Sequence, residues 1–95
     1  MPAATRIGDA DITHCSGMVR AVGSGNVFVN GIPWSRQGDV NTVHLMPCPK
    51  CCVPHSAAIA VGSSTVFVNG RGAGRVGDAT CTAVAAGSPN VFAGG

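Results

Sequence analysis

The sequence predicts an all-β protein built from short hairpins with pseudo-threefold symmetry. The pentapeptide VFVNG occurs at 27–31 and again at 66–70, and a third, altered copy, VFAGG, occupies 91–95. The 95 residues also include 14 Gly and 6 Pro but no Tyr, a composition that favours tight turns. Asn-Gly between strand-like runs is the strongest short hairpin signal. We find no amphipathic helix pattern in the chain.

A longer unit surrounds each pentapeptide. GSGNVFVNGIPWSRQGD at 23–39 aligns without a gap with GSSTVFVNGRGAGRVGD at 62–78. Each copy predicts a Gly-Ser turn, a Val-Phe-Val strand, a type I′ Asn-Gly turn, a second short strand and an Arg-x-Gly-Asp turn. In that last segment we expect the glycine to supply a second tight turn and the aspartate to bond local backbone amides. These residues are Gly38, Gly77, Asp39 and Asp78.

The third copy, GSPNVFAGG at 87–95, lacks the return strand and the Arg-x-Gly-Asp turn. The missing half occurs at the other end of the chain, as AATRIGD at 3–9. We therefore expect the N-terminal segment to pair with the C-terminal strand, which closes a ring of three units and removes exposed sheet edges. An open row of hairpins is the alternative arrangement.

Apolar and basic residues repeat with the units. Val and Phe alternate along each strand, so that one set faces inward, and an outward set repeated three times would make a threefold docking face. The arginines of the three turns are expected to pair with a neighbouring unit's aspartate or to cap loop carbonyls, in preference to a phosphate site. The residues are Val27, Val29, Val66, Val68 and Val91; Phe28, Phe67 and Phe92; and Arg6, Arg36 and Arg75.

Residues with metal-ligand chemistry follow each Arg-x-Gly-Asp turn. His14 and His44 both lie five residues past the aspartate, and Cys81 lies three residues past it. Equivalent positions converge on the axis of a threefold ring, and the longest linker, residues 40–61, adds a fourth ligand in His55. Four protein ligands leave no open position, so the site would be a structural staple for a small core. The predicted ligands of one Zn²⁺ are His14, His44, His55 and Cys81.

The sulfur ligand remains open among five cysteines. Cys15 could replace its neighbour His14 as a ligand, or take the place of Cys81. A Cys-rich site on Cys48, Cys51 and Cys81 is the second choice, although a zinc ribbon would need a second C-x2-C pair. The other cysteines, Cys52 included, would be thiols or a disulfide formed under stress. Tetrahedral nitrogen and sulfur ligation favours zinc over iron.

Charge and motifs exclude several functions. The net charge of +2 comes from six scattered basic residues, which argues against nucleic-acid binding. The chain has no Glu, no H-E-x-x-H, no G-x-S-x-G and no phosphate loop, so we expect no enzyme; a thiol catalyst on Cys48, Cys51 or Cys52 is the weakest hypothesis. Asp9 and Asp11 interrupt any signal peptide, which predicts synthesis in the cytoplasm without one.

With the pattern GS-x-x-VFVNG-x-x-x-x-R-x-GD and its trailing His, the chain resembles the PAAR-repeat proteins, over nearly its whole length. The tetrapeptide that names the family, Pro-Ala-Ala-Arg, corresponds to Pro-Trp-Ser-Arg at 33–36, Gly-Ala-Gly-Arg at 72–75 and Ala-Ala-Thr-Arg at 3–6.

This resemblance implies a sharp pseudo-threefold cone that caps a trimeric spike, one chain per trimer. The spike would be the valine-glycine-repeat protein (VgrG) of a type VI secretion system or the central spike of a contractile phage tail, driven through a target membrane. The family's three His and one Cys around an apical zinc correspond to His14, His44, His55 and Cys81. We expect residues 1–95 to be a single repeat domain with no extension, so that effector cargo would bind non-covalently. The alternative is a stand-alone zinc-binding module that recognises protein or nucleic acid.

Overall fold

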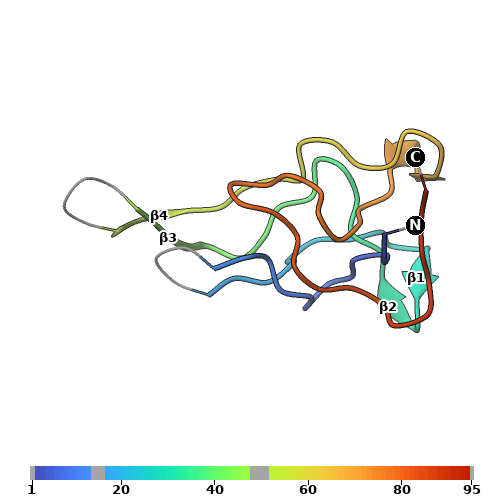
Figure 1. Cartoon of the computed structure of the whole chain (residues 1–95), viewed down its shortest axis with the longest axis horizontal. Helices are drawn as coiled ribbons and strands as arrows, with labels where there is room; N and C mark the ends of the chain where they lie inside the picture. Colours follow the sequence, from blue (N-terminus) through green and yellow to red (C-terminus); the bar gives the residue numbers. More distant parts are fainter. Residues whose placement is uncertain (1, 14–16, 48–51, 95) are drawn as a thin grey trace.

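The computed structural model describes residues 2–13, 17–47 and 52–94, and for 44–47 and 52–55 it describes the backbone alone. Across these residues the protein is all-β, as predicted, and its regular elements are short strands. None of the described residues belongs to a helix that is long and apolar enough to cross a membrane. The molecule measures 40 × 23 × 23 Å and tapers along its long axis (Figure 1).

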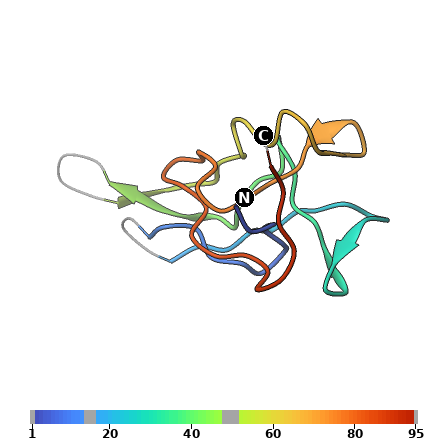
Figure 2. The same ribbon diagram turned by 45° about the vertical axis from the view of Figure 1, so that its right-hand side comes forward.

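In the described part of the chain, regular strands form three antiparallel hairpins. β1 (Phe28–Val29) pairs with β2 (Ile32–Pro33), and β5 (Phe67–Val68) pairs with β6 (Arg71–Gly72) in the equivalent register. Both hairpins lie at the wide end, near the two chain termini (Figures 1 and 2). β3 (His44–Pro47) pairs with β4 (Cys52–His55) and projects at the opposite, narrow end.

The turns have the predicted backbone conformations. φ is positive at both central residues of each Asn-Gly turn, which is the type I′ geometry. It is also positive at the glycine of each Arg-x-Gly-Asp turn, where a side chain would be strained. The values are 55° at Asn30, 77° at Gly31, 53° at Asn69, 77° at Gly70, 90° at Gly8, 88° at Gly38 and 93° at Gly77.

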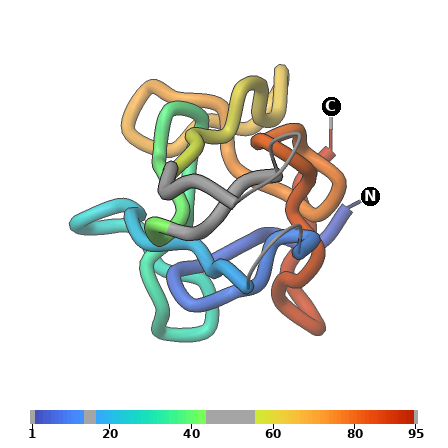
Figure 3. The backbone as a smooth tube through the Cα atoms, turned by 90° about the vertical axis from the view of Figure 1, so that its left-hand side faces the viewer, coloured from blue at the N-terminus to red at the C-terminus, as the bar shows by residue number. Residues whose placement is uncertain are grey.

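The N-terminal segment closes the ring. Ala3 forms an antiparallel bridge with Phe92, and the Ala4 N–H donates to the Val91 carbonyl at 2.9 Å. Viewed along the long axis, three lobes surround the centre, and the chain termini meet in one of them (Figure 3). The expected pairing of the two ends is therefore confirmed, and an open row of hairpins is wrong.

Three backbone hydrogen bonds connect the three units in a closed circuit. Thr5 N–H donates to the Gly74 carbonyl (3.1 Å), Gly74 N–H to the Ser35 carbonyl (2.9 Å), and Ser35 N–H to the Thr5 carbonyl (3.0 Å). All three residues are buried. A Cβ at Gly74 would lie 2.5 Å from the Ser35 carbonyl oxygen and 2.8 Å from Ile59 Cδ1. Only glycine fits this position without moving the backbone.

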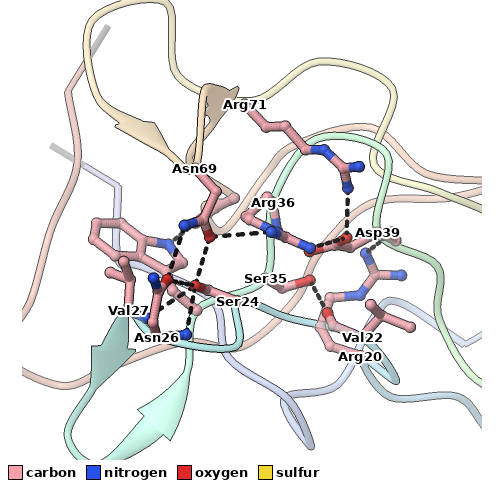
Figure 4. Close-up of polar contacts among 12 residues, drawn as sticks. Arg20, Val22, Ser24, Asn26, Val27, Ser35, Arg36, Asp39, Asn69 and Arg71 are labelled. Atoms are coloured by element: carbon pink, nitrogen blue, oxygen red, sulfur yellow. Dashed lines mark hydrogen bonds and ion pairs between the residues drawn. The ribbon is translucent and has the colours of Figure 1, made fainter.

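Each arginine of the repeated turn joins its own unit to the next. The Arg36 backbone N–H and Nε donate to Asp39 Oδ2, and its second guanidinium nitrogen donates to Asp39 Oδ1. The remaining nitrogen reaches Asn69 Oδ1, at 3.1 Å, in the hairpin turn of the following unit, where Ser24 Oγ also donates (Figure 4). Because the turn folds back on itself, Arg36 pairs with the aspartate of its own turn, which corrects our expectation of a pair between units.

The other two units repeat this arrangement. Arg6 pairs with Asp9 and reaches Asn30 of the first hairpin. Arg75 pairs with Asp78 and donates to the carbonyl of Gly94, the residue that stands where the other copies have asparagine. A main-chain oxygen thus replaces the missing side-chain amide, and the three docking contacts continue around the ring.

The core departs from threefold symmetry at one ion pair. The carbonyls of Arg20, Ile59 and Val84 accept equivalent hydrogen bonds from the glycines of the three Arg-x-Gly-Asp turns, so the three residues occupy equivalent positions. Arg20 is nevertheless a cation, fully buried, and its guanidinium donates to the equally buried Asp11 Oδ2 at 3.0 Å. Of these three equivalent core positions, two therefore hold apolar side chains and the third holds an arginine in an ion pair.

Substitution of Gly74 by alanine should destabilise the fold by about 2 kcal/mol, because the new methyl group forces the central backbone circuit apart. Gly25→Ala is the matched control: a Cβ there meets no atom within 4 Å, and its stability should stay within about 1 kcal/mol of wild type. Urea denaturation measures both. Equal stability of the two variants would contradict the role of the circuit.

Arg20→Ile and Asp11→Asn should each cost about 3 kcal/mol, because each leaves a buried charge without its partner. In the double variant, isoleucine replaces Arg20 as at the equivalent Ile59, and asparagine replaces Asp11 as at the equivalent Asn41. Its free energy of unfolding should lie within about 1 kcal/mol of wild type. A double-mutant cycle of unfolding free energies checks this. Additive single and double effects would show that the two residues do not depend on each other.

Candidate functional site

The predicted metal ligands belong to segments that meet at the narrow end. His44 and His55 are opposed Cα partners at the base of the β3–β4 hairpin. Cys81 lies in the loop after Asp78, and it alone of the four has a described side chain. His14 lies outside the described residues, as do the alternative ligands Cys15, Cys48 and Cys51. The described side chains therefore do not by themselves assemble a ligand cluster.

Asn41 ties three of these segments together. The asparagine is three residues before His44, and its Oδ1 accepts a hydrogen bond from the backbone of Ala57 (2.8 Å), two residues after His55. Its Nδ2 lies 3.9 Å from Cys81 Sγ and donates toward it. One buried side chain thus contacts the segments of three predicted ligands.

The segment that leads to His14 joins the same cluster. The Ile12 N–H donates to the Ala83 carbonyl at 2.8 Å, and Thr82 Oγ1 donates to the Ile12 carbonyl at 2.7 Å. Ile12 is two residues before His14, and Thr82 follows Cys81 directly. The fold therefore brings the chain on either side of all four predicted ligand positions to one end of the molecule.

A charged cluster lies directly beside Cys81. Asn41 Nδ2 donates to Asp11 Oδ2 (2.9 Å), and the same oxygen accepts from Arg20. Burial lowers the pKa of the Arg20 guanidinium, while the charges of Asp11, Asp39 and Cys81 act in the opposite direction. The buried guanidinium of Arg20 therefore lies beside the Asp11 carboxylate at this end of the molecule.

The sequence interpretation missed this cluster. Arg20 and Asp11 both stand in the linker that follows the N-terminal Arg-x-Gly-Asp turn, where neither matches a motif. Extending the repeat alignment into the linkers would have found them, because Arg20 aligns with Ile59 and Val84. A lone arginine at a position that is apolar in the other copies is the available signal for a buried ion pair.

At the wide end, three equivalent phenylalanines remain exposed. Phe28, Phe67 and Phe92 are 54%, 60% and 48% exposed, while the residues that follow them in the strands are buried. The predicted alternation of inward and outward faces is confirmed, and each hairpin contributes one aromatic ring. Together these three side chains form what we call the phenylalanine triad.

All four acidic side chains of the chain are held in ion pairs. Asp9, Asp39 and Asp78 bind the arginines of their turns, and Asp11 binds Arg20. Each carboxylate has a structural partner, so the acidic residues hold the fold together.

Comparison with protein families agrees with the geometry. A family model described as the PAAR motif matches residues 8–83, which include the β1–β2, β3–β4 and β5–β6 hairpins and the narrow-end segments. None of the curated proteins compared matches the chain. Proteins with this motif are structural, typically bind metal and associate with the spike tips of contractile secretion and phage-tail machines. Because the match spans most of its length, the chain belongs to the PAAR-motif family.

Proposed function

We propose that this chain is the metal-stabilised, membrane-piercing tip of a contractile injection machine, and that one chain caps one trimeric spike. The observation that carries the proposal is the closed ring of three units within a single chain, joined by the Thr5–Ser35–Gly74 circuit. A threefold object built from one chain can meet three identical subunits at once along their common axis. The partner would be a VgrG-type trimer or a phage central spike.

The phenylalanine triad supports docking through the wide end. Three half-exposed aromatic rings, one per unit, form a repeated apolar feature on the face that carries β1–β2 and β5–β6. The end of a trimeric β-helix exposes strand edges that need a cover. A threefold apolar face of this kind would bury both surfaces in one contact.

Zinc at the narrow end would stabilise the tip. Two imidazoles on opposed positions of β3 and β4, a third from the segment after Ile12 and the Cys81 sulfur give a nitrogen and sulfur donor set that suits tetrahedral zinc. Residues directly opposite in an antiparallel pair are close neighbours, so His44 and His55 can share one ion. The ion would hold together the narrow-end segments, which few regular strand pairs connect. His14, His44, His55 and Cys81 would hold it.

The role proposed is structural rather than catalytic. With its four carboxylates paired to arginines, the chain has no acidic side chain left as a general base. Four protein ligands would also leave the zinc no position for an activated water. The same tip would also serve as a non-covalent adaptor for effector cargo at the end of the apparatus.

Wild-type protein should contain one zinc per chain, measured by inductively coupled plasma mass spectrometry. Alanine at His14, His44, His55 or Cys81 should remove the metal and lower the melting temperature by more than about 10 °C, because binding free energy is then lost from folding. Cys15→Ala, Cys48→Ala and Cys52→Ala are the controls and should keep zinc. Zinc retained by Cys81→Ala would assign the sulfur ligand to another cysteine, and metal-free wild type would contradict the zinc site.

Replacement of the phenylalanine triad by serine should abolish docking while the fold survives. Each single Phe→Ser change should weaken binding to the trimeric spike of the same machine about tenfold, since a half-buried ring contributes about 1.4 kcal/mol. Ile12→Ser with Val43→Ser, two exposed apolar residues near the narrow end, should leave affinity unchanged. Calorimetry gives the affinity, and light scattering should give one chain per trimer. Unchanged binding by the triple variant, or salt-sensitive binding to nucleic acid alone, would favour a stand-alone module instead.

A further inference from the structure

The ion pair of Arg20 and Asp11 is not required to fill the core. Ile59 and Val84 occupy the positions equivalent to Arg20, and both are about 1% exposed. Buried ion pairs seldom stabilise a fold more than apolar residues of similar size. In this chain the pair is also incompletely satisfied: among the described residues, Asp11 Oδ1 and Arg20 Nε are buried without a hydrogen-bond partner. The presence of the Arg20–Asp11 ion pair therefore needs an explanation other than stability.

Its connections lead to the narrow end. Arg20 donates to Asp11 Oδ2, and it also donates to the carbonyls of Asp39 (3.1 Å) and Ala57 (3.4 Å), on either side of the β3–β4 hairpin. Asp11 Oδ2 in turn accepts from Asn41 Nδ2. Arg20 thus holds the Asp11 carboxylate, and it also holds the backbone at Asp39 and Ala57. Both the carboxylate and this backbone contact or adjoin Asn41.

The amide of Asn41 has one orientation in this network. Its oxygen accepts from the Ala57 N–H, and one hydrogen of its nitrogen goes to Asp11. The nitrogen's other contacts are two sulfurs, Met18 Sδ at 3.4 Å and Cys81 Sγ at 3.9 Å. The thioether of Met18 is neutral, whereas a metal-bound cysteine sulfur is anionic and is the better hydrogen-bond acceptor.

We infer that Asp11, Arg20 and Asn41 are positioning residues for the metal centre, and that Asn41 orients the Cys81 sulfur as the single sulfur ligand. The inference rests on the function proposed above. Groups behind the ligands commonly fix ligand orientation and carry much of a site's affinity. Here Arg20 holds Asp11, Asp11 holds Asn41, and Asn41 donates to the sulfur. The same contacts favour Cys81, whose side chain the structure describes, as the sulfur ligand.

Two variants test this inference in the full chain. Asn41→Thr introduces the residue that stands at the equivalent position 80 and removes the N–H donor; zinc affinity, measured by competition with a chromophoric chelator, should fall about 10- to 100-fold. Asp11→Asn with Arg20→Ile removes both charges and gives the core an apolar residue at position 20, as at the equivalent Ile59 and Val84. Zinc affinity should fall about tenfold. In the Co²⁺-loaded protein, both should shift the sulfur-to-cobalt charge-transfer band.

Asn69→Gly is the matched control. This change removes contacts with Ser24 and Arg36 at the wide end, so it should lower the melting temperature but leave the zinc affinity and the cobalt band unchanged. Wild-type affinity and spectrum in either folded test variant would overturn the inference and leave the zinc site standing. Zinc-free wild type would overturn both.

Discussion

The structure depends on a circuit of three backbone hydrogen bonds that joins Thr5, Ser35 and Gly74 around the long axis. Each unit donates a backbone hydrogen bond to one neighbour and accepts one from the other. Separating any unit from the ring therefore breaks two hydrogen bonds in the buried centre. Close approach within this circuit requires glycine at position 74, where no Cβ fits. This small centre explains why a chain with few large side chains can still enclose a core.

Around this centre, the repeated arginine, asparagine and serine side chains hold the hairpins in place. Arg36 is bound to its own turn and to the next hairpin, and the same contact recurs at Arg6 and Arg75. Because each turn is locked by its own aspartate, the arginine reaches the neighbour in a fixed direction. Gly94 shows that the contact needs only an oxygen at this point, whether from an amide or from the backbone.

The two ends of the molecule have different chemistry. The wide end repeats the same apolar residue three times, which would match the three identical subunits of the proposed partner. The narrow end abandons symmetry, with a buried cation in one third and a long hairpin between two of the predicted ligands. The proposed zinc site combines three His ligands with one Cys ligand, a mixed set that a single chain can supply, whereas a true trimer would repeat each ligand three times.

The repeat alone was enough to predict the all-β class, the type I′ turns, the alternating Val and Phe and the joining of the two chain ends, because turn geometry and strand alternation are local properties. The β3–β4 hairpin was not predicted, since its strands contain proline and cysteine and carry no repeat signal. Partners that lie far apart in sequence were decided by the tertiary structure: the arginine contacts between units, the Arg20–Asp11 pair and the approach of Asn41 to Cys81. These contacts depend on how three units close around one axis, and that packing determines which buried charges meet.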